Sequence, residues 1–129
     1  MTINEYQQLA LRTESRLDGP MSNARIKVYK DGITELKWAD RITQGLMGLS
    51  GESGECLDML KKCLFQGHIL DMKHLAKELG DVAWYLAVAA NAIGYDLETI
   101  LQMNVDKLKL RYPEGFDSVM SVNRKEGDV

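Results

Sequence analysis

The sequence predicts an all-α protein whose helices pack as a four-helix bundle. Apolar residues recur at steps of three and four in successive segments, which is the spacing of an amphipathic helix. Capping residues precede these segments, and breaks that contain Gly or Pro separate them. At 129 residues the chain fits one domain. This length allows a single core, but it is short for a buried two-metal site made by one copy.

The first helix is predicted to begin after Thr2, because Thr2 and Glu5 have the spacing of a capping box. Its apolar and small residues at helical spacing are Ile3, Tyr6, Leu9, Ala10, Thr13 and Leu17. The Asp-Gly-Pro sequence at 18–20 should end it. We interpret residues 18–33 as a surface loop, with a short extended piece at 26–29. This loop is long for a compact domain.

A long second helix is predicted from just after Thr34 to about Phe65, with residues 66–67 ending it. Its apolar side is formed by Leu36, Ile42, Leu46, Leu49, Cys56, Leu57, Leu60 and Leu64. Four glycines at every third position weaken this prediction: Gly45, Gly48, Gly51 and Gly54. Each Gly in a helix interior costs roughly 1 kcal/mol relative to Ala. We expect close contact with another helix, together with metal binding, to offset this cost.

The third helix has the clearest pattern, from a cap at Asp71 to a C-terminal Gly94. Its apolar stripe consists of Leu75, Leu79, Val82, Leu86, Ala89 and Ile93. Asp96 should cap a fourth helix, which Tyr112 and Pro113 end. Its core side is formed by Leu97, Leu101, Val105 and Leu108. The domain is therefore expected to span 1–116, followed by a polar tail at 117–129.

The composition excludes several classes of function. The net charge of −3 is not that of a protein that binds nucleic acid. No apolar run reaches the length of a membrane span, and no signal peptide is apparent. Cys56 and Cys63 would lie about 10.5 Å apart along one helix, beyond the limit of about 7 Å for a disulfide. We expect reduced cysteines, a cytoplasmic location, and surface positions for His68 and His74.

Two acidic pairs indicate the chemistry. Glu52 and Glu55 form one pair, and Glu78 and Asp81 the other, each three residues apart within a predicted helix. Residues at this spacing are neighbours on a helix surface. A single exposed pair would usually be solvated, but both pairs lie among core-type residues, where unpaired acids are rare. Two carboxylates about 4 Å apart repel by about 4 kcal/mol at an effective dielectric constant of about 20. The four acids therefore predict a bound cation, either Mg²⁺ or Mn²⁺.

The helical angles place this cluster at the edge of the core. Glu78, Asp81 and Tyr85 form a strip beside the apolar stripe of the third helix and not opposite to it. Such a strip should line a cleft between helices. On the fourth helix, Lys107 and Arg111 share a strip that could neutralise a polyphosphate. A solvated cationic helix end is the simpler interpretation of that strip.

Four motifs stand out in the sequence, at residues 48–55, 77–85, 104–107 and 111–116. In these motifs the chain resembles the MazG-like nucleoside triphosphate pyrophosphohydrolases of the all-α NTP pyrophosphatase superfamily. Residues 4–7 and 12–13 are also similar to those of its short members. The resemblance extends to about Phe116. It departs at Gly51, where many members carry a further Glu, which bears on the number of metal ions.

The resemblance implies an oligomeric enzyme, a homodimer or homotetramer, that hydrolyses a nucleoside triphosphate to the monophosphate and pyrophosphate and removes unwanted nucleotides. It implies that Mg²⁺ is held by Glu52, Glu55, Glu78 and Asp81. It assigns orientation or deprotonation of the attacking water to Glu55. The substrate-binding residues that it implies are Asn104, Lys107, Arg111 and Tyr112, with Lys61 and Lys62 as further candidates.

Alternatives remain at this stage. A di-iron oxidase is disfavoured, because its Glu-x-x-His motifs are absent from both pairs. A phosphoribosyl-ATP pyrophosphohydrolase would share the fold with a different substrate, and a non-catalytic oligomerisation module would share it without activity. Trp38, Trp84 and Tyr85 could stack on a base, although aromatic residues at helical spacing usually belong to the core. The sequence does not identify the base.

Overall fold

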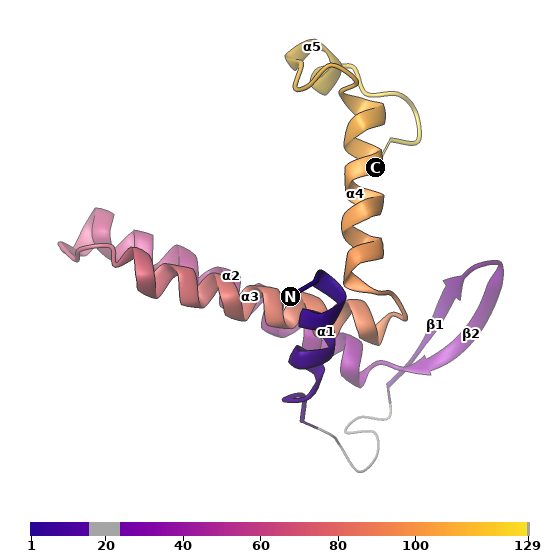
Figure 1. Ribbon diagram of the computed structural model, residues 1–129, viewed down its shortest axis with the longest axis horizontal. Helices are drawn as coiled ribbons and strands as arrows, with labels where there is room; N and C mark the ends of the chain where they lie inside the picture. Colours follow the sequence, from indigo (N-terminus) through magenta and orange to yellow (C-terminus); the bar gives the residue numbers. More distant parts are fainter. Residues whose placement is uncertain (16–23, 129) are drawn as a thin grey trace.

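The computed structural model describes residues 1–15 and 24–128. Within these residues the chain forms five helices and one two-stranded sheet (Figure 1). In chain order the elements are α1 (Ile3–Leu11), β1 (Arg25–Lys30), β2 (Ile33–Trp38), α2 (Asp40–Gln66), α3 (Met72–Ala92), α4 (Leu97–Arg111) and α5 (Ser118–Val122). The predicted helical class is thus confirmed, with a small sheet added to it.

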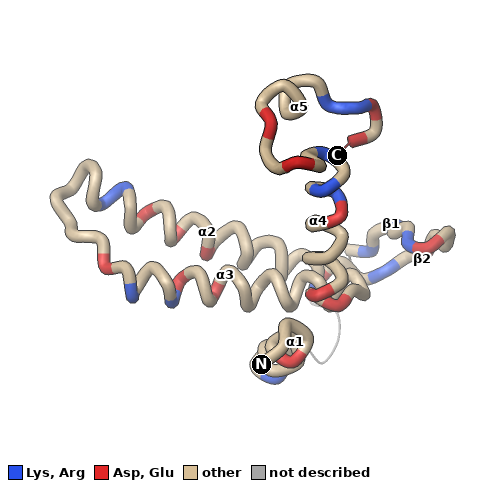
Figure 2. The backbone as a smooth tube through the Cα atoms, turned by 45° about the horizontal axis from the view of Figure 1, so that its top comes forward, with Lys and Arg blue, Asp and Glu red and all other residues tan. Residues whose placement is uncertain are grey.

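The long helices α2 and α3 pack side by side as an antiparallel hairpin (Figures 1 and 2). Helix α1 packs against α3 at one end of this hairpin, where α4 also begins. From there α4 runs away from the α2–α3 pair and carries α5 at its far end (Figure 1). A single copy therefore does not close a four-helix bundle. None of the helices in the described part is long and apolar enough to cross a membrane.

The β-hairpin lies where the start of the second helix was predicted. Ile33–Trp38 pairs with Arg25–Lys30 in antiparallel register, and Asp31 and Gly32 form the turn with φ angles of 52° and 79°. Two positive φ angles suit the tight turn of a two-residue hairpin. The predicted helix start after Thr34 is therefore wrong, because these residues hydrogen-bond to the preceding strand. The helix begins at Asp40 instead.

The expected loop at 18–33 also changes. Its extended piece at 26–29 is confirmed and belongs to a longer strand. Residues 18–20, the expected end of the first helix, lie outside the described residues, and α1 already ends at Leu11. Lys30 attaches the hairpin to the rest of the fold: its ammonium group donates to the Gly94 carbonyl and lies 4.1 Å from the centroid of the Tyr95 ring.

The buried core lies where α1, α3 and α4 meet. It is made of small and apolar side chains, namely Ala10, Ala87, Ala90 and Leu97. Gln7 lies at the centre of this core and is 1% exposed. Its amide nitrogen donates to the Ala87 and Tyr95 carbonyls, each at 3.2 Å, and its amide oxygen accepts from the Leu97 N–H at 3.0 Å. One side chain therefore joins three helices at their junction.

Most predicted helix ends are confirmed. Thr2 and Glu5 form the capping box, and the Asp71 carboxylate accepts from the Lys73 and His74 backbone N–H groups at the start of α3. Gly67 and Gly94 follow helix ends with left-handed φ angles of 71° and 81°. Asp96 precedes α4 as predicted, but its side chain makes no capping hydrogen bond. The first residues of the polar tail beyond 116 form α5.

The glycines of α2 divide into two groups. A Cβ at Gly45 would lie 3.0 Å from Ala89, and a Cβ at Gly48 would lie 2.0 Å from the Tyr85 ring. Both positions therefore allow α2 and α3 to approach closely, as predicted. Gly51 and Gly54 differ, because a Cβ there would have no neighbour within 4 Å. Close packing within one copy thus accounts for only the first two.

Candidate metal centre

The acidic pairs converge on the α2–α3 hairpin. α2 supplies Glu52 and Glu55, one helical turn apart, and α3 runs alongside and supplies Glu78. One carboxylate oxygen from each of these residues lies within 4.8 Å of the others. Glu52 and Glu78 are half-buried, and Glu55 is exposed. Three of the four predicted ligands are therefore brought together.

The fourth acid, Asp81, lies close enough to act electrostatically. Desolvation by its surroundings raises the pKa of Glu52, and the negative charges of Glu55, Asp81 and Glu78 raise it further. Such crowding favours the neutral carboxyl or a bound cation. The donor set consists of carboxylate oxygens, which Mg²⁺ and Mn²⁺ prefer over nitrogen or sulfur. The residues present thus fit a hard divalent cation.

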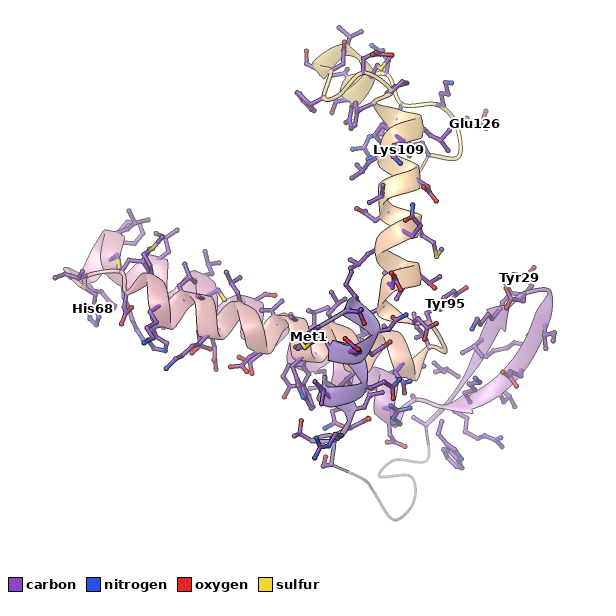
Figure 3. All side chains as sticks on the ribbon, viewed as in Figure 1. Met1, Tyr29, His68, Tyr95, Lys109 and Glu126 are labelled. Atoms are coloured by element: carbon purple, nitrogen blue, oxygen red, sulfur yellow. The ribbon has the colours of Figure 1, made fainter. Side chains whose placement is uncertain are left out.

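His74 lies beside this cluster. Its Nε2 is 2.9 Å from Glu78 Oε1, one turn along α3. The sequence interpretation placed His74 on the surface, which is correct for an exposed ring, but it overlooked this contact. The spacing of four residues between 74 and 78 was the available signal. His68, by contrast, lies at the far tip of the α2–α3 hairpin (Figure 3).

The basic strip on α4 is not near the acidic cluster in the same copy. Asn104, Lys107 and Arg111 lie along α4, with Tyr112 directly after its end, and α4 runs away from the hairpin that carries the acids (Figures 1 and 2). Moreover, the Arg111 guanidinium is already paired with Asp128. Within one chain, the acidic cluster and the basic strip of the predicted site are therefore apart from each other.

Three other candidates for contacts to the substrate, which are Lys61, Lys62 and Trp38, have other partners. Lys61 and Lys62 form ion pairs with Asp58 at 2.6 and 2.7 Å, and these pairs lower the pKa of Asp58 to about 2. Trp38 ends β2, where the Arg25 guanidinium lies 5.1 Å from its ring centroid. None of these contacts directs the three side chains toward the acidic cluster of Glu52, Glu55 and Glu78.

The aromatic residues of α3 help to hold the fold. The Trp84 indole N–H donates to the Ala10 carbonyl at 3.1 Å and to Thr13 Oγ1 at 2.8 Å, as expected for a structural residue. Its ring meets that of Tyr85 edge-on at 4.8 Å. Because Gly48 packs against the same Tyr85 ring, one part of that ring is covered by α2.

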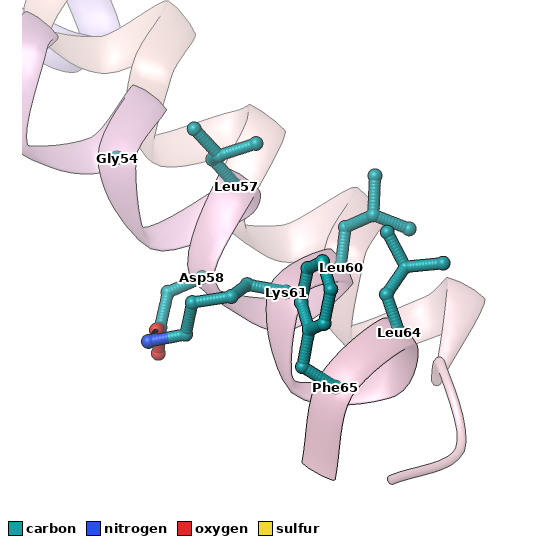
Figure 4. Close-up of a pocket in the computed structure, with 7 residues that line it drawn as sticks. All are labelled: Gly54, Leu57, Asp58, Leu60, Lys61, Leu64 and Phe65. Atoms are coloured by element: carbon teal, nitrogen blue, oxygen red, sulfur yellow. Dashed lines mark ion pairs between the residues drawn. The ribbon is translucent and has the colours of Figure 1, made fainter. Parts of the chain in front are cut away.

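Helix α2 carries an apolar groove (Figure 4). Its lining residues are Gly54, Leu57, Asp58, Leu60, Lys61, Leu64 and Phe65. Leu57 and Leu64 are each 66% exposed, and Phe65 is 80% exposed. Large apolar surfaces of this kind are uncommon on an isolated soluble protein and typically mark contact sites.

A helical hairpin with convergent carboxylates defines a candidate metal-dependent enzyme. Residues 42–116 match the MazG nucleotide pyrophosphohydrolase domain, which covers more than half of the chain, so the protein belongs to this family. The Gene 37 protein of Mycobacterium phage L5 is 42% identical over 73 residues. That alignment covers 54% of this chain and 64% of the phage protein, just under two thirds of its length. No solved structure matches the chain.

Proposed function

We propose that the protein hydrolyses a nucleoside triphosphate to the monophosphate and pyrophosphate, with Mg²⁺ or Mn²⁺ held by Glu52, Glu55, Glu78 and Asp81. The observation that carries this proposal is the convergence of three carboxylates within 4.8 Å on the helices of a MazG domain. An unneutralised cluster would be unfavourable because like charges repel. Its presence among apolar helices therefore favours a cation-dependent activity.

The acidic residues have different roles in this proposal. Bound Mg²⁺ supplies Lewis acidity to phosphate oxygens and lowers the pKa of water. Glu52 and Glu78 are half-buried, and the His74 ring contacts Glu78, which suits them to a fixed binding role. Glu55 is exposed, so we assign to it the orientation of the attacking water and acceptance of its proton.

We further propose that two copies complete the site. The phosphates need cations, and the candidates Lys107 and Arg111 lie on α4, away from the acids of the same copy (Figure 2). The α2 groove and the exposed apolar side of α4, where Leu101 and Leu108 are 39% and 41% exposed, provide surfaces for the contact. In this arrangement Asn104 and Tyr112 from the partner would also face the substrate, within a homodimer or homotetramer.

The proposed substrate is a class of compounds, the nucleoside triphosphates, and not one particular nucleotide. A role in removing unwanted nucleotides in the cytoplasm fits the family. Tyr85, Trp38, Lys61 and Lys62 remain candidates for contacts to the base, sugar or phosphates. A phosphoribosyl-ATP would present the same triphosphate to the acids, so it belongs in the panel of substrates to be tested.

Product analysis tests the activity. Purified protein is incubated with Mg²⁺ and each nucleoside triphosphate, and with phosphoribosyl-ATP, and the products are separated. Monophosphate and pyrophosphate in equal amounts are expected, with no release when Mg²⁺ is chelated. Release of orthophosphate, or no turnover of any triphosphate, would contradict the proposal. Glu55→Gln should abolish turnover while the helical circular dichroism signal is retained.

Mixed oligomers test the shared site. Glu55→Gln and Arg111→Gln should each be inactive alone, but their co-expressed hetero-oligomer should recover part of the activity. Recovery is expected because one site of that pair then has intact acids from one copy and an intact Arg111 from the other. Glu55→Gln co-expressed with Glu78→Gln is the matched control, since every acidic cluster is then defective. No recovery in the first pair would place both halves of the site in one copy.

A further inference from the structure

The C-terminal segment folds back onto the end of α4. After α5 the chain returns toward α4 (Figure 1), and a tight turn closes where the Asp128 N–H donates to the Lys125 carbonyl at 3.1 Å. Gly127 adopts a left-handed φ of 84° within this turn, a conformation that Gly tolerates best. The turn presents the Asp128 side chain to Arg111.

Asp128 occupies the guanidinium of Arg111 in bidentate fashion. Arg111 Nε donates to Asp128 Oδ2 at 2.7 Å, and Nη2 donates to Oδ1 at 2.5 Å. The two side chains are only 11% and 18% exposed, so solvent has little access to the pair. The hydrogen bonds from Arg111 lower the pKa of Asp128, and the positive charges of Arg111, Arg124 and Lys107 lower it further. The carboxylate therefore lies in a cationic environment.

A carboxylate and a phosphate group require the same donors. The planar guanidinium fork binds either of them through two parallel hydrogen bonds. While Arg111 Nε and Nη2 donate to Asp128, this edge of the five-donor guanidinium is not available to a phosphate. The pairing therefore competes directly with the phosphate-binding role assigned to Arg111.

We propose that Asp128 is an internal competitor for the phosphate-binding site at Arg111, so that the docked tail holds the site closed and a phosphate must displace the carboxylate. This inference rests on the proposed function, because that function assigns a phosphate to Arg111. The cost to the ligand follows from population: affinity falls in proportion to the fraction of molecules in which Arg111 is free. Removal of the Asp128 carboxylate should remove that cost.

The test measures binding of inorganic pyrophosphate by calorimetry, with divalent cations chelated so that the acidic cluster adds no affinity. Asp128→Ala should bind pyrophosphate roughly fivefold more tightly than the wild type, the gain expected when a modest ion pair no longer competes. Glu126→Ala is the matched control. It removes the same charge from the same tail (Figure 3), where Glu126 makes no hydrogen bond or ion pair among the described residues. Its affinity should stay within twofold of wild type.

Two further variants separate competition from a structural role. Asp128→Asn keeps the shape and one acceptor, so a smaller gain is expected. In an Arg111→Gln background, Asp128→Ala should give no gain. Equal affinity of wild type and Asp128→Ala, including no measurable binding to either, would overturn the proposal, as would the same gain without Arg111. Calorimetry needs no turnover, so its outcome is independent of whether product analysis supports pyrophosphohydrolysis.

Discussion

Gly48 of α2 lies against the ring of Tyr85 on α3, where a Cβ would come within 2.0 Å of Cε1. The ring cannot easily move aside, because Trp84 meets it edge-on at a centroid distance of 4.8 Å. We therefore predict that Gly48→Ala separates the two helices and destabilises the fold by about 1–3 kcal/mol, the usual cost of overpacking. Chemical denaturation followed by circular dichroism measures this change.

Gly51 is the matched control for Gly48. It lies one turn further along α2, where a Cβ would meet nothing within 4 Å. Gly51→Ala should leave stability unchanged or raise it by up to about 1 kcal/mol, because Ala is the better helix former. Equal destabilisation by both substitutions would show that helix contact is not the reason for glycine at position 48.

The buried amide of Gln7 supports a second prediction. Gln7→Leu keeps the volume but leaves the Leu97 N–H and the Ala87 and Tyr95 carbonyls without the partner that Gln7 supplies. Unsatisfied buried groups of this kind typically cost about 1–3 kcal/mol each. The midpoint of denaturation should fall clearly. Gln8→Leu, at an exposed neighbouring position, should change it little, and a similar fall in both would refute the assigned role of Gln7.

Much of the helical framework was predictable because its signals are local. Asp71 caps α3 and Gly67 ends α2 through contacts with their own backbone neighbours. The residue types at these two positions are therefore sufficient to identify the helix ends. The acidic cluster was predictable for a related reason. Helical spacing places Glu52 beside Glu55, and only the pairing of the two helices had to be inferred to add Glu78.

The features that were missed depend on contacts between distant residues. The start of α2 was misplaced because the strand at Ile33–Trp38 exists only through its pairing with Arg25–Lys30. Likewise, Gly48 and Gly51 have the same sequence spacing, yet only one of them faces Tyr85. The pairing of Arg111 with Asp128 joins residues 17 positions apart, with α5 between them, and the sequence pattern of α4 contains no signal for it.

The Asp71 cap makes a prediction about pH. Hydrogen bonds from the His74 and Lys73 backbone N–H groups lower the pKa of Asp71 below its usual value of 3.8. A lowered pKa means that the ionised cap stabilises the folded state above the unfolded-state pKa, and that this contribution is lost as pH falls through the folded-state pKa. Asp71→Ala should therefore lower the thermal midpoint at pH 7, and the difference from wild type should shrink below about pH 4. A difference that is constant down to pH 2 would mean that the charge of Asp71 does not matter.

Binding of a cation by the acidic cluster predicts opposite effects of one substitution with and without metal. Without divalent cations, Glu52→Gln should raise the thermal midpoint, because it removes a carboxylate whose ionisation is disfavoured by desolvation and by the negative charges of its acidic neighbours. With Mg²⁺ at about 100 times its Kd, the wild type should gain about 2.7 kcal/mol of stability by mass action, and Glu52→Gln should gain much less.

Asp58→Asn is the control for this prediction. Asp58 lies just beyond Glu55 on α2 but is paired with Lys61 and Lys62, so this variant should keep the full response to Mg²⁺. Thermal melts in chelator and in a Mg²⁺ series measure all three proteins, and an equal Mg²⁺ response in wild type and Glu52→Gln would remove Glu52 from the metal site.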